Sequence, residues 1–544
     1  MRAGRKPCPH FVKIQGRRER GLKKRIQLLL LGLLGSICLS GCRNVGENII
    51  QLSDTETLEK SEESSTEQLK YVFLFIGDGM SYSQIQLTNY YLNAVENEGE
   101  VLRTQNKLNM LNLAVTGSAQ TYDSTSFTPD SASSATAIAT GHKTWSGCLN
   151  VSEDFSEKYE TIAEKLKKQK DYKIGIVSSV NINHATPAAF YAHQESRSNY
   201  YEIGLELLES DFDYFAGGGF RRKTGDDGDK ENLYDLAKEA GYMVVRKQEK
   251  AQNLKPSDDK VIVVTENMAD RNAMNYELDR ENEEWALADY VEKGIELLEN
   301  ETGFFMMVEG GKIDWACHAN DAGSMIADVI ALDEAIGKAL DFYERHPDET
   351  LILVTGDHET GGLSIGFAGT NYDTFLTNLK NQKISYVKYD ADYVSAYREN
   401  ETPFENVMED ITELFGLQYS PTEEEKMFHE DSADAHENAA GEETLELTNY
   451  EYNLLKEAYE ETMQRTGEET EFSQEDYIKY GSYEPLTVTI THILNNKSGI
   501  NFSSYAHTGL PVEVFAQGVG AEKFNGYYDN TEIYKKLAQL VQVD

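Results

Sequence analysis

Three short apolar runs, each followed by an acidic residue, constrain the fold of this chain more than any other feature. The runs and their acids are 71–76 with Asp78, 304–308 with Glu309, and 350–355 with Asp357. A short apolar run that breaks at glycine is typical of a strand buried on both faces, as in a parallel sheet covered by helices. Open sheets of this kind gather their polar chemistry at the carboxyl ends of the strands. We therefore expect the three acids to lie at one edge of a sheet.

The rest of the chain predicts an α/β fold with a mostly parallel central sheet and helices on both faces. Further strand patterns lie at about 172–178, 261–264 and 512–516. Helical patterns alternate with them at about 157–169, 283–299, 323–343 and 530–541. Strands that alternate with helices favour a parallel sheet. Candidate site residues are spread from Asp78 to His507 and must converge, so residues 70–544 are expected to form one domain.

Residues from about 366 to 500 depart from this alternation. They include a strongly acidic segment near 385–448, with the run Glu430 to Glu443, and an amphipathic helical pattern over Asn449–Arg465. We interpret this insertion as an acidic helical subdomain that flanks the mouth of the site. It could select substrates as a lid, contribute an arm to a dimer, or be a solvated decoration of the surface.

A helix is predicted to begin at Ser131. The segment 128–136 places Asp130 as a cap before a run of Ala, Ser and Thr that ends at Gly141. Oriented N–H groups at a helix N-terminus favour an alkoxide and a bound phosphate. The helix dipole contributes only about 1 kcal/mol, so we expect a metal ion to supply most of what ionising this serine requires. A lone serine at such a position is more often a cap than a nucleophile.

Acidic and imidazole side chains that could hold metal ions follow the strand patterns. Asp314 and His318 come shortly after Glu309, and residues four apart on a helix lie on one face and can hold one ion together. A further nitrogen is expected from His507.

A second set begins at the end of the run 350–355, where His358 directly follows Asp357. Asp78 lies at a glycine-flanked turn, where the backbone can approach an ion closely and one carboxylate can bridge two metals. Taken singly, an Asp-Gly turn or a histidine is more often structural. Their joint appearance favours a metal centre.

With Thr186, Arg197 and His184 added, these residues resemble the alkaline phosphatase family, from about Tyr71 to the C-terminus. The resemblance implies that residues 70–544 are the catalytic domain and that it holds two Zn2+ ions and one Mg2+ ion. The implied ligands are Asp314, His318 and His507 for the first zinc, Asp78, Asp357 and His358 for the second, and Asp78, Thr186 and Glu309 for the magnesium. His184 replaces an aspartate of the best-known bacterial members, and an imidazole suits zinc or cobalt better at the third site.

The resemblance also implies a phosphomonoesterase that releases an alcohol and inorganic phosphate. Ser131 would form a phosphoserine, and Arg197 would hold the phosphate with its planar fork. Zinc would replace the general base of a serine triad. A phosphodiesterase or sulfatase of the same superfamily is the second reading, disfavoured because Arg197 suits a dianionic phosphate and no cysteine stands at position 131. A non-catalytic surface lipoprotein that binds metal or phosphate is the third.

The first 41 residues are predicted to be a lipoprotein signal peptide. A basic segment precedes an apolar stretch over 26–39 that is shorter than the roughly 20 residues a spanning helix requires. The chain then reads Leu-Ser-Gly-Cys, which resembles the lipobox of bacterial lipoproteins and implies lipidation of Cys42. Residues 42–69 are polar and acidic and are expected to be a flexible tether. The protein would thus be extracytoplasmic and lipid-anchored to the cell membrane, facing outward; a plain signal peptide or an uncleaved anchor is the alternative.

Composition limits the partners. The formal net charge of −42, from 93 acidic and 51 basic residues, argues against nucleic acid. Small phosphate monoesters are the expected partners, and a homodimer is left open. Apart from the cysteines of the leader and Cys42, only Cys148 and Cys317 remain. No disulfide framework is required, and whether these two pair cannot be read from the sequence.

Overall fold

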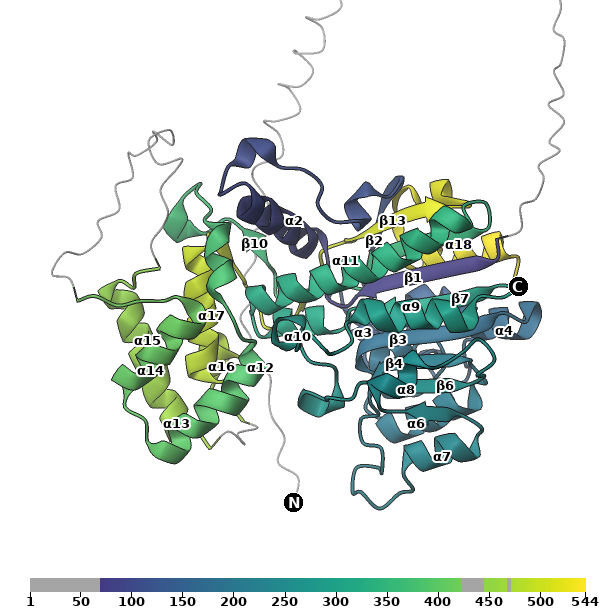
Figure 1. The fold of residues 1–544 in the computed structure, drawn as a ribbon, viewed down its shortest axis with the longest axis horizontal. Coiled ribbons are helices and arrows are strands. Elements are labelled where there is room, and N and C mark those ends of the chain that lie inside the picture. The colour runs from purple at the N-terminus through teal and green to yellow at the C-terminus, as the bar shows by residue number, and fades with distance from the viewer. Residues whose placement is uncertain (1–68, 422–444, 467–470) are drawn as a thin grey trace, which may run out of the picture. The chain divides into compact units, whose positions relative to one another are not determined.

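The computed structural model describes residues 69–421, 445–466 and 471–544 (Figure 1). The expected leader, the lipidation site Cys42, nearly all of the tether and the run Glu430 to Glu443 lie outside these residues. Within the described ranges, no helix is both long enough and apolar enough to cross a membrane.

In the described part of the chain, ten strands form one sheet in the order β14-β2-β13-β8-β1-β7-β3-β4-β6-β5. Their bounds are β1 Tyr71–Gly77, β2 Val115–Gln120, β3 Lys173–Asn181, β4 Tyr214–Gly218, β5 Met243–Val245, β6 Val261–Val264, β7 Phe304–Glu309, β8 Thr350–Gly356, β13 Val512–Gly518 and β14 Gly526–Asp529. Only β13 runs antiparallel to its neighbours β8 and β2. The prediction of a mostly parallel sheet is confirmed.

Both faces of the sheet are covered by helices, as the apolar strands predicted. Because side chains alternate along a strand, Phe73 and Phe75 of β1 enter one core and Leu74 and Ile76 the other. The first core contains α2 (Tyr82–Glu96), α9 (Leu287–Leu298) and α11 (Ala322–Arg345), of which α9 and α11 lie across the near side of the sheet in Figure 1. The second contains α3 (Ser131–Thr140), α4 (Ile162–Lys170) and α18 (Thr531–Val541).

The remaining helices within the sheet region connect its strands. They are α5 Ala185–Ala188, α6 Tyr200–Glu209, α7 Leu233–Glu239, α8 Gln248–Gln252 and α10 Lys312–His318. Two small antiparallel pairs lie beyond the strand ends, β9 (Glu359–Thr360) with β12 (His507–Thr508), and β10 (Ser364–Ile365) with β11 (Ile500–Asn501).

The expected insertion is helical where it is described. It leaves the fold after β10 and returns at β11, its pairing partner. Its helices gather beside one another in Figure 1 and are α12 Tyr386–Tyr389, α13 Ser395–Asn400, α14 Phe404–Phe415, α15 Asn449–Gln464, α16 Gln474–Tyr480 and α17 Pro485–Lys497. The amphipathic helix predicted over Asn449–Arg465 is α15.

Some expected boundaries shift because capping side chains decide where helices begin. The helix expected from 157 begins at Ile162, since Thr161 and Glu164 form a reciprocal cap in which Thr161 Oγ1 accepts from the Glu164 backbone and Glu164 Oε2 accepts from the Thr161 backbone at 2.8 Å. The helix expected from 283 begins at Leu287, where Asp289 Oδ2 accepts from the Ala286 backbone at 2.8 Å. Cys148 and Cys317 are both free and buried, which settles the question of their pairing.

Candidate active site

The three acids that follow the apolar runs meet at one edge of the sheet. β1 lies between β7 and β8, and the parallel register pairs Ile76 with both Glu309 and Thr355. Asp78, Glu309 and Asp357 therefore leave the sheet side by side, and all three are completely buried. This confirms the expectation from the strand pattern.

Ser131 begins α3, as the sequence predicted. The side chain of Asp130 accepts a hydrogen bond from the backbone of Ser133 at 3.1 Å, and Gly141 ends the helix in a left-handed conformation with φ of 74°. Every residue of α3 is buried, which explains the small side chains. Ser131 Oγ lies 3.4 Å from Asp78 Oδ1 and 3.2 Å from His358 Nε2.

The structure gathers the predicted metal-binding residues into three groups whose ligand atoms lie within 4.8 Å of one another. The groups are Asp314 with His318 and His507, Asp78 with Asp357 and His358, and Asp78 with His184 and Glu309. Asp78 belongs to two groups, as expected for a bridging carboxylate. Thr186 adjoins the third group, because its Oγ1 donates to Asp78 Oδ2 at 3.4 Å.

The first group has the geometry of a site for a cation. Asp314 and His318 share a face of α10, with His318 Nε2 3.3 Å from Asp314 Oδ1. His318 Nδ1 faces the carbonyl oxygen of Tyr505 at 2.6 Å, and His507 Nδ1 faces that of Pro129 at 2.7 Å. Because carbonyl oxygens only accept, each Nδ1 carries the proton. The two Nε2 lone pairs then face each other at 3.1 Å, an arrangement that a metal ion between them would satisfy.

The third group contains buried polar atoms without a partner. Among the described residues, His184 Nδ1 and Glu309 Oε1 make no hydrogen bond, although both are buried. The other oxygen of Glu309 accepts from the hydroxyl of Ser178. Burial, with the charge of Arg197, lowers the pKa of His184 well below its usual value, which leaves the neutral imidazole that binds metals. These free ligand atoms fit a cation.

Electrostatics support the same conclusion. Burial and repulsion from neighbouring carboxylates raise the pKa values of Asp78 and Asp357 well above the usual range, and burial raises that of Glu309 to about 7. Burial acts in the same direction on Asp314, but His318 and His507 hold its pKa well below the usual value. Buried carboxylates this close repel one another unless cations lie between them.

Arg197 is held beside the cap of α3. Its Nη1 donates to Asp130 Oδ2 at 2.9 Å, while Asp130 Oδ1 accepts from the backbone of Gly147 at 2.8 Å. Burial opposes ionisation of Asp130, but Arg197 and Gly147 hold its pKa at about 2. Within the described residues this is the only hydrogen bond of the guanidinium group. Its other N–H donors remain available to an anion near Ser131.

Two polar residues of the site were not found from the sequence. Thr360 Oγ1 donates to Asp314 Oδ1 at 2.6 Å and lies 3.3 Å from His358 Nδ1, so it links two of the groups. The hydroxyl of Ser178, at the end of β3, donates to Glu309. Thr360 follows His358 closely in the sequence, and this proximity could have indicated that it belongs to the site. Ser178 lies inside a strand, and no feature of the sequence marked it as a site residue.

Comparisons with known proteins agree with this geometry. The model of the family described as "Alkaline phosphatase" matches residues 69–543. Alkaline phosphatase 4 of Bacillus subtilis (strain 168) is 28% identical over 494 residues, which cover 89% of this chain and 90% of the relative.

Two solved structures show the same fold. The cold-active alkaline phosphatase of a psychrophilic Shewanella sp. is 26% identical, with a TM-score of 0.67, over 87% of this chain and 99% of its own. A histidine-to-glutamate variant of the alkaline phosphatase from the Antarctic bacterium TAB5, with Mg bound in its M3 site, is 25% identical, with a TM-score of 0.56, over 88% and 99%. With the family model matched along nearly the whole described chain, this chain belongs to the alkaline phosphatase family.

Proposed function

We propose that this chain is a metal-dependent phosphomonoesterase that hydrolyses phosphate monoesters to an alcohol and inorganic phosphate through a phosphoserine at Ser131. One observation carries the proposal. The Ser131 hydroxyl stands at the N-terminus of a buried helix, within 3.4 Å of Asp78 and 3.2 Å of His358, where two groups of metal-binding side chains meet. Membership of the alkaline phosphatase family supports the same reaction.

The side chains fit two zinc ions and a third ion. The first zinc would be held by Asp314, His318 and His507, the second by Asp78, Asp357 and His358, and the third ion by Asp78, His184, Thr186 and Glu309. The chemistry that bound ions supply is Lewis acidity, which lowers the pKa of a serine hydroxyl or a water and offsets charge on oxygen. Magnesium lies in the M3 site of the TAB5 variant, in which glutamate replaces a histidine, whereas the imidazole of His184 favours zinc or cobalt at the third site of this chain.

The residues of the chain then act in two displacements. Ser131 Oγ attacks phosphorus, the new O–P bond forms, and the alcohol oxygen leaves with its bonding electrons and takes up a proton. Water next attacks the phosphoserine, which releases inorganic phosphate and restores the hydroxyl. The N–H groups at the start of α3 and the fork of Arg197 bind the phosphate oxygens in both steps.

Hydrolysis of p-nitrophenyl phosphate at alkaline pH, with and without chelator, tests the proposal. Ser131→Ala should lower kcat by about a thousandfold or more, as expected when the nucleophile is lost. Thr140→Ser, at the other end of the same helix, should stay close to the wild type. A folded, metal-loaded protein without turnover would overturn the proposal. Faster hydrolysis of bis(p-nitrophenyl) phosphate or of the sulfate ester would favour the diesterase or sulfatase instead.

We also infer a lipid anchor from the apolar stretch 26–39 and the lipobox that ends at Cys42. Lipidation at Cys42 would keep the enzyme on the outer face of the cell membrane. Cys42→Ser should move the phosphatase from the membrane fraction to a soluble fraction. An unchanged distribution of the variant would argue for an uncleaved anchor.

A further inference from the structure

The imidazole of His184 lies between two aromatic rings, and each ring carries an arginine. The ring of Tyr200 stacks on His184 at 6.4 Å between centroids, and Trp315 meets it edge-on at 5.8 Å. Arg221 Cζ lies 4.6 Å from the centre of the Tyr200 ring, and Arg271 Cζ lies 5.6 Å from that of Trp315. The two arginines therefore flank the group formed by Asp78, His184 and Glu309.

Neither arginine has an acidic partner among the residues that the structure describes. In the described part of the chain, seven of ten arginines form an ion pair with a carboxylate, while Arg221 and Arg271 make no ion pair or side-chain hydrogen bond. The sequence has 93 acidic residues against 51 basic ones, so unpaired arginines are unexpected. Burial lowers the pKa of Arg221, and the neighbouring charges of Arg271, Arg222 and Arg197 lower it further, although Tyr200 acts against them.

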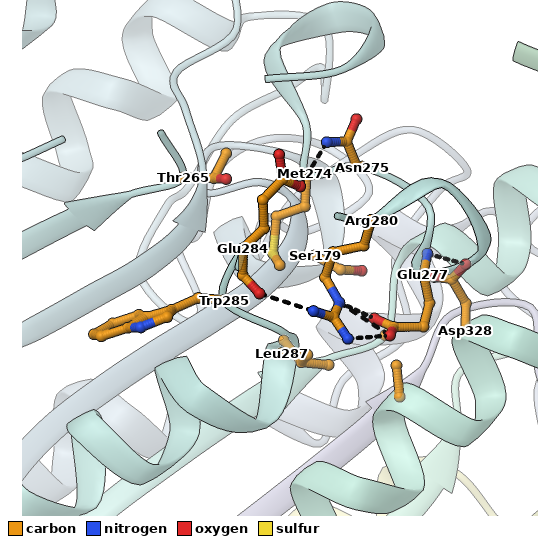
Figure 2. A pocket seen from close by; sticks show the side chains of 12 residues that line it. Ser179, Thr265, Met274, Asn275, Glu277, Arg280, Glu284, Trp285, Leu287 and Asp328 are labelled. Carbon is orange, nitrogen blue, oxygen red and sulfur yellow. Dashed lines mark hydrogen bonds and ion pairs between the residues drawn. The ribbon is translucent and has the colours of Figure 1, made fainter. Parts of the chain in front are cut away.

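Arg280 shows the ordinary arrangement in the same protein. It lines a small pocket in which its Nε donates to both carboxylate oxygens of Glu277 at 2.8 and 2.9 Å, and its Nη1 donates to the carbonyl oxygen of Glu284 at 2.8 Å (Figure 2). The guanidinium donors of Arg280 are thus bonded within the protein. Those of Arg221 and Arg271 make no hydrogen bond to any described residue.

Two buried asparagines fix the backbones that carry the free arginines. Asn183, next to His184, accepts from the Arg221 backbone at 2.9 Å and donates to its carbonyl oxygen at 3.0 Å. Asn181 donates to the carbonyl oxygen of Arg271 at 2.9 Å. Both asparagines are fully buried at or just beyond the end of β3. The arginines are therefore placed by the same strand end that places His184.

The loop of Arg271 holds a strained conformation. Arg271 and Asn272 both have left-handed backbones, with φ of 56° and 68°. Their neighbour Asp270 is held by an ion pair of 2.8 Å with the fully buried Lys312. Strain of this kind persists where the surrounding structure enforces it, and it gathers at ligand sites.

We propose that Arg221 and Arg271 form a second anion subsite beside the catalytic centre, and that the preferred substrates are phosphate monoesters that carry a second phosphate. The subsite rests on the proposed function, which accounts for the first phosphate. Free guanidinium forks bind phosphate through two parallel N–H donors, and the rings of Tyr200 and Trp315 hold the two guanidinium groups by cation–π contacts. A second phosphate would also relieve repulsion between the arginines.

Another role for the arginines makes different predictions. If Arg221 and Arg271 served only to offset the buried carboxylates, their loss would change metal binding and affect all substrates equally. A subsite changes only the discrimination between substrates. Long-range repulsion by the acidic surface acts against a doubly phosphorylated substrate, so a preference for one requires a local cationic site.

Kinetics with fructose 1,6-bisphosphate and its two monophosphates, fructose 1-phosphate and fructose 6-phosphate, test the subsite. The wild type should prefer the bisphosphate in kcat/KM. Arg221→Ala and Arg271→Ala should each lower kcat/KM for the bisphosphate about tenfold, the effect of losing one charge-assisted hydrogen bond. Their monophosphate rates should stay within about twofold.

Arg246→Ala is the matched control. Arg246 also lies over a tyrosine, with Cζ 5.1 Å from the ring centre of Tyr234, and forms no ion pair among the described residues. Tyr234 packs against Phe220 rather than His184, so this variant should change neither substrate class.

The outcomes separate the subsite from the reaction. Equal losses on all substrates, reduced metal content, or a wild type without preference would overturn the subsite while monophosphate turnover upheld the phosphatase. If no monoester is hydrolysed, the proposed function fails, and binding to the metal-loaded Ser131→Ala protein decides the subsite. Tighter binding of the bisphosphate than of fructose 6-phosphate, lost in Arg271→Ala, would uphold it, and equal affinities would overturn it.

Discussion

Two groups of charged side chains lie on different sides of α10. In each group the acids repel one another, and the two groups differ in how this repulsion is offset. Residues two apart on a helix point about 200° apart, so Asp314 joins the metal-binding groups while Lys312 turns away from them. Lys312 Nζ lies 2.8 Å from Asp270 Oδ1 and 3.9 Å from the centre of the Tyr276 ring. Its side chain is completely buried, and its positive charge acts on three acidic neighbours, the buried Asp328 and the half-buried Asp270 and Asp279.

The metal-binding groups have no such internal cation. Among the described residues, Asp78, Glu309, Asp314 and Asp357 form no ion pair with lysine or arginine. The comparison teaches that an acidic cluster with its own lysine is neutralised within the fold, whereas a buried one without a lysine or arginine partner fits a cation from solution.

Removal of metal should have the largest effect on activity and stability, and it should act only on the metal-binding groups and not on the cluster around Lys312. Chelation should abolish turnover and lower the free energy of unfolding by about 4 kcal/mol, as expected when a ligand present at a thousand times its Kd is withdrawn. Urea unfolding with EDTA, and after zinc and magnesium are added back, measures this change.

Asp78→Asn tests whether the stability lost on chelation comes from metal bound near this carboxylate. In chelated protein the variant should be more stable than the wild type, because one of the mutually repelling buried carboxylates is gone. With metal present it should be the less stable of the two. The same sign under both conditions would contradict the metal assignment.

Lys312→Met should have the next largest effect, because it breaks the cluster that has its own cation. The pair is fully buried at Lys312 and partly exposed at Asp270. Removal of Lys312 leaves its acidic neighbours uncompensated, and we expect the free energy of unfolding to fall by about 3 kcal/mol. Lys338→Met is the control, since Lys338 and its partner Glu292 are both partly exposed and such pairs contribute about 1 kcal/mol or less. Similar losses in the two variants would show that Lys312 carries no special role.

Thr360→Val should have a smaller effect, confined to the metal-binding groups. The variant keeps the shape of the side chain but removes the hydroxyl that donates to Asp314. Loss of a hydrogen bond to a metal ligand lowers metal affinity about ten- to a hundredfold, which a zinc titration against a competing chelator would measure. Thr350→Val is the control, because the buried hydroxyl of Thr350 has no hydrogen-bond partner among the described residues.

Asp390 offers the mildest test, since this buried acid forms no ion pair with any described residue and belongs to none of the three candidate metal groups, although the charge of Arg398 acts on it. Burial raises its pKa to about 8, although Thr487 donates to it. The folded protein then binds a proton that the unfolded chain releases near pH 4, so stability falls as pH rises from about 4 to about 8. Thermal unfolding across this range should show a shallower decline for Asp390→Asn than for the wild type. Parallel curves would mean that Asp390 does not titrate in this window.

Much of the fold could be predicted because its central strands are buried on both faces. β1, β7 and β8 each read as a continuous apolar run, and all three occur where the sequence indicated. β2, β4, β5 and β14 were missed. β2 and β14 are partly exposed and contain Gly, Ser and Asp, β5 has only three residues, and the buried β4 ends in two glycines. The antiparallel direction of β13 has no signal in its own residues, since direction depends on how the chain returns to the sheet.

The sequence by itself determined the residues whose chemistry follows from local spacing. The cap before Ser131, the strand ends at Asp78 and Asp357, and the pair Asp314 and His318 all depend on neighbours within a few positions, where backbone geometry is nearly fixed. These patterns were sufficient to predict a metal centre beside a serine.

Only the tertiary structure decided which distant residues share a neighbourhood. Lys312 and Asp314 are both charged and two positions apart, yet one stabilises a loop and the other joins a metal-binding group. Arg221 and Arg271 became notable only when the structure left them without partners beside His184. The reason is physical: whether a charge is paired depends on contacts between segments far apart in the chain, and local residue patterns do not encode those contacts.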